Sequence, residues 1–357
     1  MLIEQATAPS LSQLRPVKPV HTAGFPVYDD LVDALVDPKR DPDDTVAHVL
    51  GVAAGYAYSD AATVSMILAR MGLEGNRCLE VAQTVDAMLI ESTAYVVQSE
   101  DGRVVIVAYR GTQPGNILNW LTDADLHPDR IRFPFPDRDE TYDIHAGFYR
   151  NVRATRYEVI RALLRAREGK SVLPDDDTNV GHPMQRLYVT GHSLGGAMAA
   201  LLGVMLSVEP DYQEHFGEAL SGVYTFGQPM VGSPAFAAAC EAHPFLAGSV
   251  VRYIYRRDPV PHVPPKDSGR FAHFGLERSY EGSFPWLDTS EHPAGQLFLA
   301  LDFLGSTLGF VTQAFERLRA LPLKYNISDH LPHHYISALT PPGRPNEYGD
   351  AEVVAGG

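Results

Sequence analysis

The stretch from Arg186 to Leu206 limits the possible folds of this chain more than any other. Leu187 to Val189 are branched or aromatic residues, which is typical of a strand. From Leu194 onward the stretch is rich in Ala, Leu and Met, which favours a helix. A strand is therefore predicted to run directly into a helix, and the turn between them is a Gly-x-Ser-x-Gly pentapeptide centred on Ser193.

The glycines of this pentapeptide have a steric explanation. In so tight a turn, a Cβ atom at Gly191 or Gly195 would collide with its neighbours, and the serine hydroxyl is aimed out of the sheet. The Leu194 amide lies at the start of the helix, where the helix dipole favours a developing negative charge. A glycine-rich turn that closes a βα unit in a binding domain has the same motif. The order of strand, turn and small-residue helix favours a nucleophile at Ser193.

Length and composition indicate a globular α/β protein. The chain has 357 residues, of which 45% are hydrophobic and 20% charged, and α/β folds of this length often form one domain with insertions. No segment reaches the about 18 uncharged apolar residues of a membrane span, so we expect a soluble chain without a transmembrane helix. A net charge of −15 argues against nucleic acid as a partner.

Cysteine usage and the start of the sequence bear on the location of the protein. Cys78 and Cys240 lie far apart, which favours two buried free thiols over a disulfide. Residues 1–9 lack the basic region and apolar core of a secretory signal, which favours a cytoplasmic location. Export by a leaderless route, or removal of a leader, is the alternative.

Residues 1–43 are punctuated by prolines and have little periodicity, so we expect an N-terminal extended arm. From Thr45 to Met71 apolar residues recur at helical spacing. This spacing predicts two helices that are broken near Ser59, the first of them capped by Asp43 or Asp44.

Strand and helix patterns alternate along the remainder of the chain. Strands are predicted at 88–98, 104–109, 187–189, 222–226 and 249–255, and helices at 144–167, 194–206, 234–242 and after Pro332. An Asp-Gly turn joins the first two strands as a hairpin. The alternation predicts an α/β fold with a mostly parallel central sheet and helices on both faces.

Two segments stand apart from this alternation. Residues 113–128 combine bulky apolar side chains with glycine and proline, which suits a hinged flap. Residues 295–315 are markedly apolar and predict a helical hairpin within an insertion at 293–324. Extra core packing is the favoured role of this insertion, and an acyl-chain wall or a second lid is the alternative.

A serine nucleophile needs a histidine base and a carboxylate that orients it. In sheets of this kind the acid follows a strand end, and the chain order is Ser, acid, His. This rule selects Asp258, whose alternative role is a salt bridge with Arg256 or Arg257, and then His330 on the loop before the last helix. A metal site is the alternative role of the loop residues Asp329, His330, His333 and His334.

A developing oxyanion needs a second donor besides the Leu194 amide. The loop after the strand that ends at Tyr109 offers the backbone amide of Thr112 and its hydroxyl. Taken alone, the Gly-Thr pair at this position is ordinary turn chemistry.

Several of these motifs together carry a resemblance. The chain resembles the class 3, fungal-type triacylglycerol lipases of the α/β-hydrolase superfamily from about Asp44 to Leu339. The resemblance rests on Tyr109–Thr112, Asn119–Asp123, Val189–Gly196, Tyr224–Pro229, Arg256–Pro261, and Asp329 and His330 with Tyr335. Two features depart from the pattern of the secreted members: signal peptide and disulfides are not seen here, and the connection from acid to histidine is long.

The resemblance implies an α/β-hydrolase fold over residues 44–357, with Ser193, Asp258 and His330 as the triad. Thr112 and Leu194 would be the oxyanion donors. A lid near 113–128 would have Trp120 as its apolar tip, and Asp123 would hold the oxyanion loop. No metal and no cofactor is required.

We therefore predict a serine carboxylic-ester hydrolase, most simply a lipase that cleaves acylglycerol esters through an acyl-enzyme. Its partner would be a lipid or other ester substrate, met at a lipid–water interface, and the sequence does not indicate the oligomeric state. A phospholipase A1 and a short-chain esterase are the enzymatic alternatives. A non-catalytic, hydrolase-fold lipid-binding protein and a membrane-bound scaffold are the alternatives from other classes.

Overall fold

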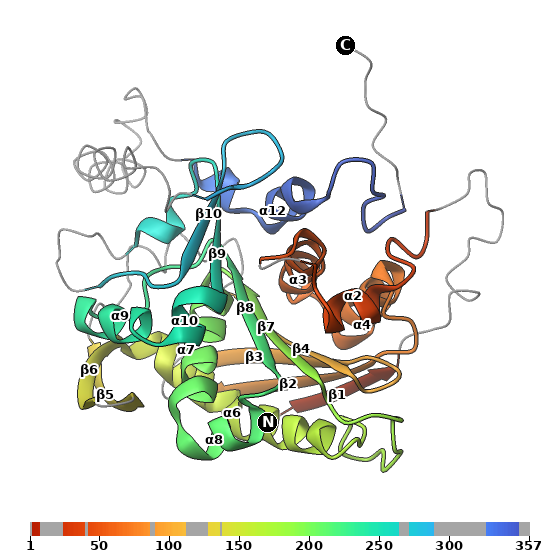
Figure 1. The fold of residues 1–357 in the computed structure, drawn as a ribbon, viewed down its shortest axis with the longest axis horizontal. Coiled ribbons are helices and arrows are strands. Elements are labelled where there is room, and N and C mark those ends of the chain that lie inside the picture. The colour runs from red at the N-terminus through yellow and green to blue at the C-terminus, as the bar shows by residue number, and fades with distance from the viewer. Residues whose placement is uncertain are drawn as a thin grey trace.

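The computed structural model describes residues 2–7, 24–39, 42–85, 90–111, 128–135, 138–263, 271–288 and 326–349. Within these ranges the chain forms one nine-stranded sheet with helices on both faces (Figure 1). The predicted lid near 113–128, except for Pro128, and the apolar insertion near 293–324 lie outside the described residues, so both stay predictions.

The centre of the sheet is parallel. Neighbouring strands follow the order β1 (Leu2–Thr7), β2 (Arg77–Val85), β3 (Ile90–Gln98), β4 (Val104–Tyr109), β7 (Arg186–His192), β8 (Leu220–Phe226), β9 (Val250–Tyr255), β10 (Leu276–Tyr280) and β11 (Leu287–Asp288). Strands β4, β7, β8, β9 and β10 pair in parallel, whereas β1 to β4 and the β10–β11 pair are antiparallel. The predicted mostly parallel central sheet is confirmed.

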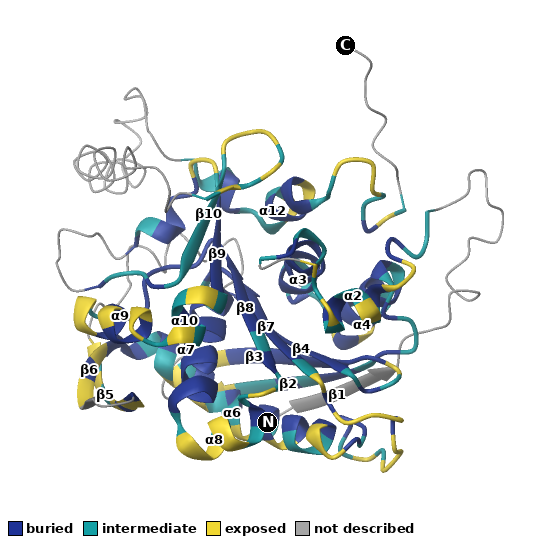
Figure 2. Ribbon diagram, viewed as in Figure 1, coloured by how far each residue is buried: buried dark blue, intermediate teal, exposed yellow. Residues whose placement is uncertain are grey.

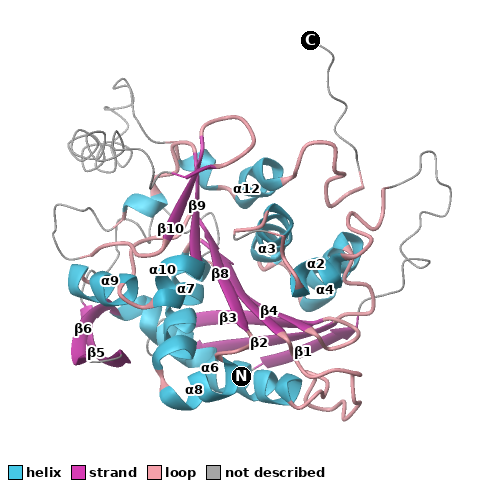
Figure 3. Cartoon of the chain, in the orientation of Figure 1, coloured by secondary structure: helices cyan, strands magenta, loops and turns pink. Residues whose placement is uncertain are grey.

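Two groups of helices cover the sheet, as Figure 1 and Figure 3 show. One face carries α2 (Leu31–Val36), α3 (Asp44–Tyr56), α4 (Ala61–Met71) and α12 (Pro332–Leu339). The other carries α6 (Ala146–Arg167), α7 (Leu194–Val208), α8 (Pro210–Phe216), α9 (Pro234–Glu241) and α10 (Pro244–Ser249). Short 3₁₀ turns are η3 (Val260–His262) and η7 (Ile327–His330).

Residues of one strand alternate between the two cores because successive side chains of a strand point to opposite faces. In β4, Val105 and Val107 join the core under α6 and α7, while Ile106 and Ala108 join the core under α3. Every residue of β4 is buried, as expected for a central strand covered on both faces (Figure 2).

Helix starts follow the predicted capping. The Asp43 side chain accepts hydrogen bonds from the Thr45 and Val46 amides at the start of α3. Asp60 likewise accepts from the Thr63 amide at the start of α4. The break between the two predicted helices is confirmed at residues 57–60. Both cysteines are free and buried, as predicted.

The prediction of an extended N-terminal arm is wrong for the described part of residues 1–43. Residues 2–7 pair antiparallel with β2, from Leu2 opposite Ala82 to Thr7 opposite Arg77. Residues 24–39 contain α2, whose Leu31 and Leu35 are buried in the core. A short apolar pair in a proline-rich stretch shows too little periodicity to reveal such a helix.

A hairpin of β5 (Pro128–Phe135) and β6 (Arg138–His145) was not predicted either. Its strands are largely charged, and their apolar residues Phe133, Phe135 and Tyr142 pack on Phe236 of α9.

Within the described ranges, no single helix is long and apolar enough to cross a membrane. Helices α7 and α8 reach that length and apolar character only together, and they are bent by 92° relative to each other.

Candidate active site

The predicted strand, turn and helix around Ser193 are confirmed. Ser193 sits between β7 and α7 with a φ of 60° and a ψ of −130°, a conformation that costs energy for any residue with a side chain. Its amide donates to Phe226 O of the neighbouring strand β8 at 2.9 Å. The turn is therefore tied to the sheet at the nucleophile itself.

The two glycines that flank Ser193 allow main-chain segments to approach each other closely. A Cβ atom on Gly191 would lie 2.2 Å from Gly195 O, and one on Gly195 would lie 2.3 Å from Tyr109 O. Neither contact is possible for a real Cβ atom, because both neighbours are main-chain oxygens. The glycines thus let the start of α7 rest on the end of β4.

The structure brings Asp258 and His330 together from opposite ends of a long connection. Asp258 follows β9 through a tight turn, in which its amide donates to Tyr255 O at 3.0 Å. His330 is the last residue of η7. His330 Nδ1 lies 2.8 Å from Asp258 Oδ2, and both side chains are buried, with 1% and 0% exposed.

The surroundings of Asp258 define its charge. Burial raises the pKa of Asp258, but the His330 charge and hydrogen bonds from His330, the Tyr335 hydroxyl and the Val260 amide outweigh it and lower that pKa. An ionised carboxylate only accepts hydrogen bonds, so His330 Nδ1 carries the proton. In neutral His330, Nε2 then has a free lone pair, which a general base requires.

The salt-bridge alternative for Asp258 is not what the structure shows, since its carboxylate faces His330 and Tyr335. Tyr335 also accepts from the Tyr255 amide at 3.1 Å, which anchors its hydroxyl beside the acid. The sequence singled out Tyr335 only as part of a motif. A tyrosine five residues after the base, on the following helix, was the available signal.

Gly227 joins the nucleophile to the acid and the base. It follows Phe226, whose carbonyl accepts from the Ser193 amide. A Cβ atom on Gly227 would lie 2.8 Å from both Asp258 Oδ2 and His330 Nδ1. The main chain of this one residue therefore runs directly over the hydrogen bond between acid and base, beside the turn that holds the serine.

Two polar atoms of the site are buried without a hydrogen-bond partner among the described residues: Ser193 Oγ and His330 Nε2. They are the two atoms between which a proton moves when a serine is activated. The Leu194 amide is the first of α7, where backbone N–H groups have no partner within the helix. Thr112, Trp120 and Asp123 lie outside the described residues.

A second set of hydrogen bonds ties the base-bearing turn to the acid loop. Asp329 Oδ2 accepts from the Arg257 amide at 3.2 Å, and its Oδ1 accepts from Asn326 Nδ2 at 2.9 Å. The Asn326 amide donates to Arg257 O at 3.0 Å. Asp329 thus has a structural task in joining the two loops. Across the described parts of the chain, no three His, Cys, Asp or Glu side chains are placed to hold a metal ion.

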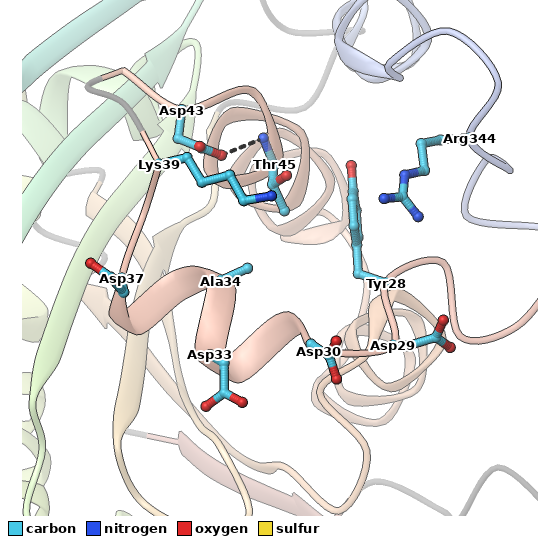
Figure 4. Close-up of a pocket in the computed structure, with 10 residues that line it drawn as sticks. All are labelled: Tyr28, Asp29, Asp30, Asp33, Ala34, Asp37, Lys39, Asp43, Thr45 and Arg344. Carbon is cyan, nitrogen blue, oxygen red and sulfur yellow. Dashed lines mark hydrogen bonds between the residues drawn. The ribbon is translucent and has the colours of Figure 1, made fainter.

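A separate polar cleft of about 450 Å³ contains none of these residues (Figure 4). Two of its acidic side chains have identifiable tasks nearby: Asp43 caps α3, and Asp33 pairs with Arg103 at 2.8 Å. Arg344 lies over the ring of Tyr28, 5.0 Å from its centroid. The cleft is lined by Tyr28, Asp29, Asp30, Asp33, Ala34, Asp37, Lys39, Asp43, Thr45 and Arg344.

Two buried histidines make the fold sensitive to acid. Burial lowers the pKa of His48 to about 3, and burial together with the His330 charge lowers that of His192 to about 3. In the unfolded chain both would titrate near 6.5. Between these values only the unfolded state binds the protons, so stability falls as pH falls, by about 1.4 kcal/mol per pH unit for each histidine.

We expect the free energy of unfolding to drop by about 3–4 kcal/mol between pH 7 and pH 5 from these two residues, measured by urea titration. His48→Gln should remove about half of this dependence, whereas Gln in place of the exposed His182 should leave it intact. A free energy that is flat across this range would contradict the prediction.

Part of this chain is similar in sequence to known lipases. Residues 106–268 match the sequence model of the family described as lipase (class 3). A lipase of Rhizopus niveus is 31% identical over 207 residues, which is 56% of this chain and 44% of that protein. Triacylglycerol lipase OBL1 of Arabidopsis thaliana is 27% identical over 259 residues, 64% of this chain and 46% of that protein. The chain thus spans about half the length of these relatives, and the predicted resemblance is confirmed.

Solved structures agree on the fold. The triacylglyceride lipase of Rhizomucor miehei superposes with a TM-score of 0.51 at 21% identity, covering 80% of this chain and 92% of that one. A lipase from Rhizopus microsporus var. chinensis gives 0.51 at 20% identity, covering 89% and 96%. The predicted α/β-hydrolase fold is confirmed.

The predicted cytoplasmic location is wrong. The relatives include a secreted mono- and diacylglycerol lipase A of Penicillium cyclopium, 24% identical over 220 residues, 59% of this chain and 62% of that protein. Lipases of Rhizopus niveus and Rhizomucor miehei are relatives of this chain as well. The prediction rested on the lack of a signal pattern in residues 1–9, and such an absence does not show where the protein acts.

Proposed function

We propose, from the match of residues 106–268 to the sequence model of the class 3 lipases, that this protein is a serine carboxylic-ester hydrolase that cleaves acylglycerol esters. The observation that carries the proposal is the buried His330–Asp258 hydrogen bond of 2.8 Å, placed by Gly227 beside the strained turn of Ser193. Lipid esters are favoured as substrates because the relatives are named lipases and triacylglycerol lipases.

The first half of the reaction forms an acyl-enzyme. Ser193 Oγ attacks the ester carbonyl carbon while His330 Nε2 takes its proton, and Asp258 stabilises the resulting imidazolium. The tetrahedral oxyanion accepts a hydrogen bond from the Leu194 amide at the positive end of α7. His330 then returns the proton to the leaving alcohol as the ester bond breaks. Thr112 remains our prediction for the second donor.

The second half reverses the roles. A water molecule gives a proton to His330 Nε2 and attacks the acyl carbonyl carbon. The new tetrahedral intermediate collapses, the bond to Ser193 Oγ breaks, and the proton on His330 returns to that oxygen. A carboxylic acid leaves, and the free enzyme is restored.

We further propose that residues 44–357 form one hydrolase domain with a lid near 113–128, which carries Trp120 and Asp123, and an apolar insertion near 293–324. In this view the lid covers the buried Ser193 until an ester substrate opens it, at a lipid–water interface. Both segments contain bulky apolar residues, which suit contact with acyl chains.

The test is a rate profile over p-nitrophenyl esters from short to long acyl chains, with trioleoylglycerol and phosphatidylcholine emulsions alongside. We expect the longer chains and trioleoylglycerol to be hydrolysed fastest, with a rate increase above the solubility limit of the ester. A preference for acetate would leave only a short-chain esterase, and a preference for phosphatidylcholine would favour phospholipase A1. A protein that no fluorophosphonate labels would be a non-catalytic lipid-binding protein.

A further inference from the structure

The imidazole of His192 is a buried polar group that takes no part in the proposed reaction steps. It directly precedes Ser193 in the chain and is 1% exposed. Its Nε2 lies 2.6 Å from His330 O, and its Nδ1 lies 2.9 Å from the Tyr58 hydroxyl. The centroid of its ring lies 4.5 Å from that of His330. Both nitrogens are thus engaged, and one of them contacts the main chain of the base.

The partners of His192 determine where its proton lies. A carbonyl oxygen only accepts, so Nε2 carries the hydrogen and donates it to His330 O. Burial and the nearby His330 charge lower the pKa of His192, which keeps it neutral. Its Nδ1 therefore has a lone pair and accepts from Tyr58, whose hydroxyl stays protonated because burial raises the pKa of Tyr58.

The carbonyl of His330 is available to His192 because of the local backbone. The turn η7 ends at His330, and α12 begins two residues later at Pro332, which has no N–H. The His334 amide, which would reach this carbonyl in a continuous helix, donates to Leu331 O at 3.0 Å instead. A carbonyl at such a helix junction, buried beside the site, needs a donor from elsewhere in the chain.

We propose that His192 is a positioning residue of the reaction, which holds the main chain of His330 through its Nε2–H while Tyr58 holds the tautomer of His192. Asp258 fixes the side chain of the base, and His192 fixes its backbone. The dipeptide of residues 192 and 193 then carries both the nucleophile and the anchor of its base, so the two cannot drift apart. The inference rests on the proposed function, since it takes His330 to be the base.

The neutrality of His192 has a second consequence. In the transition state His330 becomes an imidazolium, and a positive charge on a ring 4.5 Å away would oppose it. Because His192 is neutral, it offers a hydrogen-bond donor at this position without an opposing charge. A lysine or an arginine would supply a donor but also a charge, and neither would serve.

The test is a matched pair of amides. The nitrogen of glutamine reaches the place of histidine Nε2, while that of asparagine reaches only the place of Nδ1. We expect His192→Asn to lower kcat on a soluble p-nitrophenyl ester by about 10- to 100-fold with KM within about twofold, because a misplaced base slows chemistry and not binding. His192→Gln should stay within about fivefold of the wild type. Tyr58→Phe, which keeps the ring, should lower kcat by about 3- to 10-fold.

Each variant is compared with the wild type by active-site titration and thermal unfolding. Equal losses in the Asn and Gln variants, or no loss in either, would overturn the inference, and so would losses confined to KM. If both fail to fold, Tyr58→Phe decides, and an unchanged kcat there overturns it. Failure of the proposed function would look different, since wild-type protein would then not react with a fluorophosphonate at Ser193.

Discussion

Replacing Ser193 by alanine is expected to lower kcat/KM for ester hydrolysis by about 10⁴-fold or more, because the variant has no atom that can form the acyl-enzyme. The turn should keep its shape, because serine already adopts the strained φ of 60° in the wild type. The amide of residue 193 also still donates to Phe226 O in the variant. Ester hydrolysis is measured with a p-nitrophenyl ester, and reaction with a fluorophosphonate is measured in parallel. Both should be lost together.

A matched serine on the same helix provides the control. Ser207 of α7 is also buried, and its hydroxyl donates to Gly203 O at 2.7 Å within the helix. Ser207→Ala should therefore leave kcat/KM within about twofold of the wild type. More than a tenth of the wild-type rate in Ser193→Ala would mean that another residue is the nucleophile.

Adding a single methyl group at Gly227 is expected to lower kcat by about 10³- to 10⁴-fold, which approaches the effect of losing the acid. The new Cβ atom would lie 2.8 Å from both Asp258 Oδ2 and His330 Nδ1, so the acid and the base must move apart. The φ of 60° at Gly227 adds strain for alanine. We expect the free energy of unfolding to fall by about 1–3 kcal/mol.

Gly248 in α10 is the matched control for this substitution. A Cβ atom there would meet no heavy atom within 4 Å, and its φ lies outside the left-handed region. Gly248→Ala should keep the wild-type kcat and raise stability by up to about 1 kcal/mol, because alanine favours the helix. A Gly227→Ala enzyme with wild-type kcat would show that the contact between acid and base does not govern the reaction.

The parts of the fold that could be predicted are those that depend on local patterns. The break between α3 and α4 follows from apolar spacing, and the start of α3 follows from the predicted cap Asp43. The central strands β4, β7, β8 and β9 were predicted from short runs of strand-forming residues. Most of these residues are buried in the structure. By contrast, β1, β2 and the β5–β6 hairpin are partly polar, and they become strands by pairing with distant segments.

The candidate site divides in the same way. Ser193, Asp258 and His330 were predicted from chain order and strand ends, and the structure places acid and base in contact. The tasks assigned to Tyr335, His192 and Gly227 could not be predicted. Each depends on a hydrogen bond or a close approach between segments that are far apart in the chain, and the one signal in the sequence was the position of Tyr335 five residues after the base.

The sequence by itself determined the turn at Ser193. A strand, a glycine on either side of the serine and a small-residue helix follow one another directly in the chain, so the turn could be predicted from neighbouring residues. Only the tertiary structure decided which groups surround that turn and which of them carry protons. The pKa of Asp258 and the tautomers of His330 and His192 follow from burial and partners, and these exist only once the fold has brought β9, η7 and β7 together.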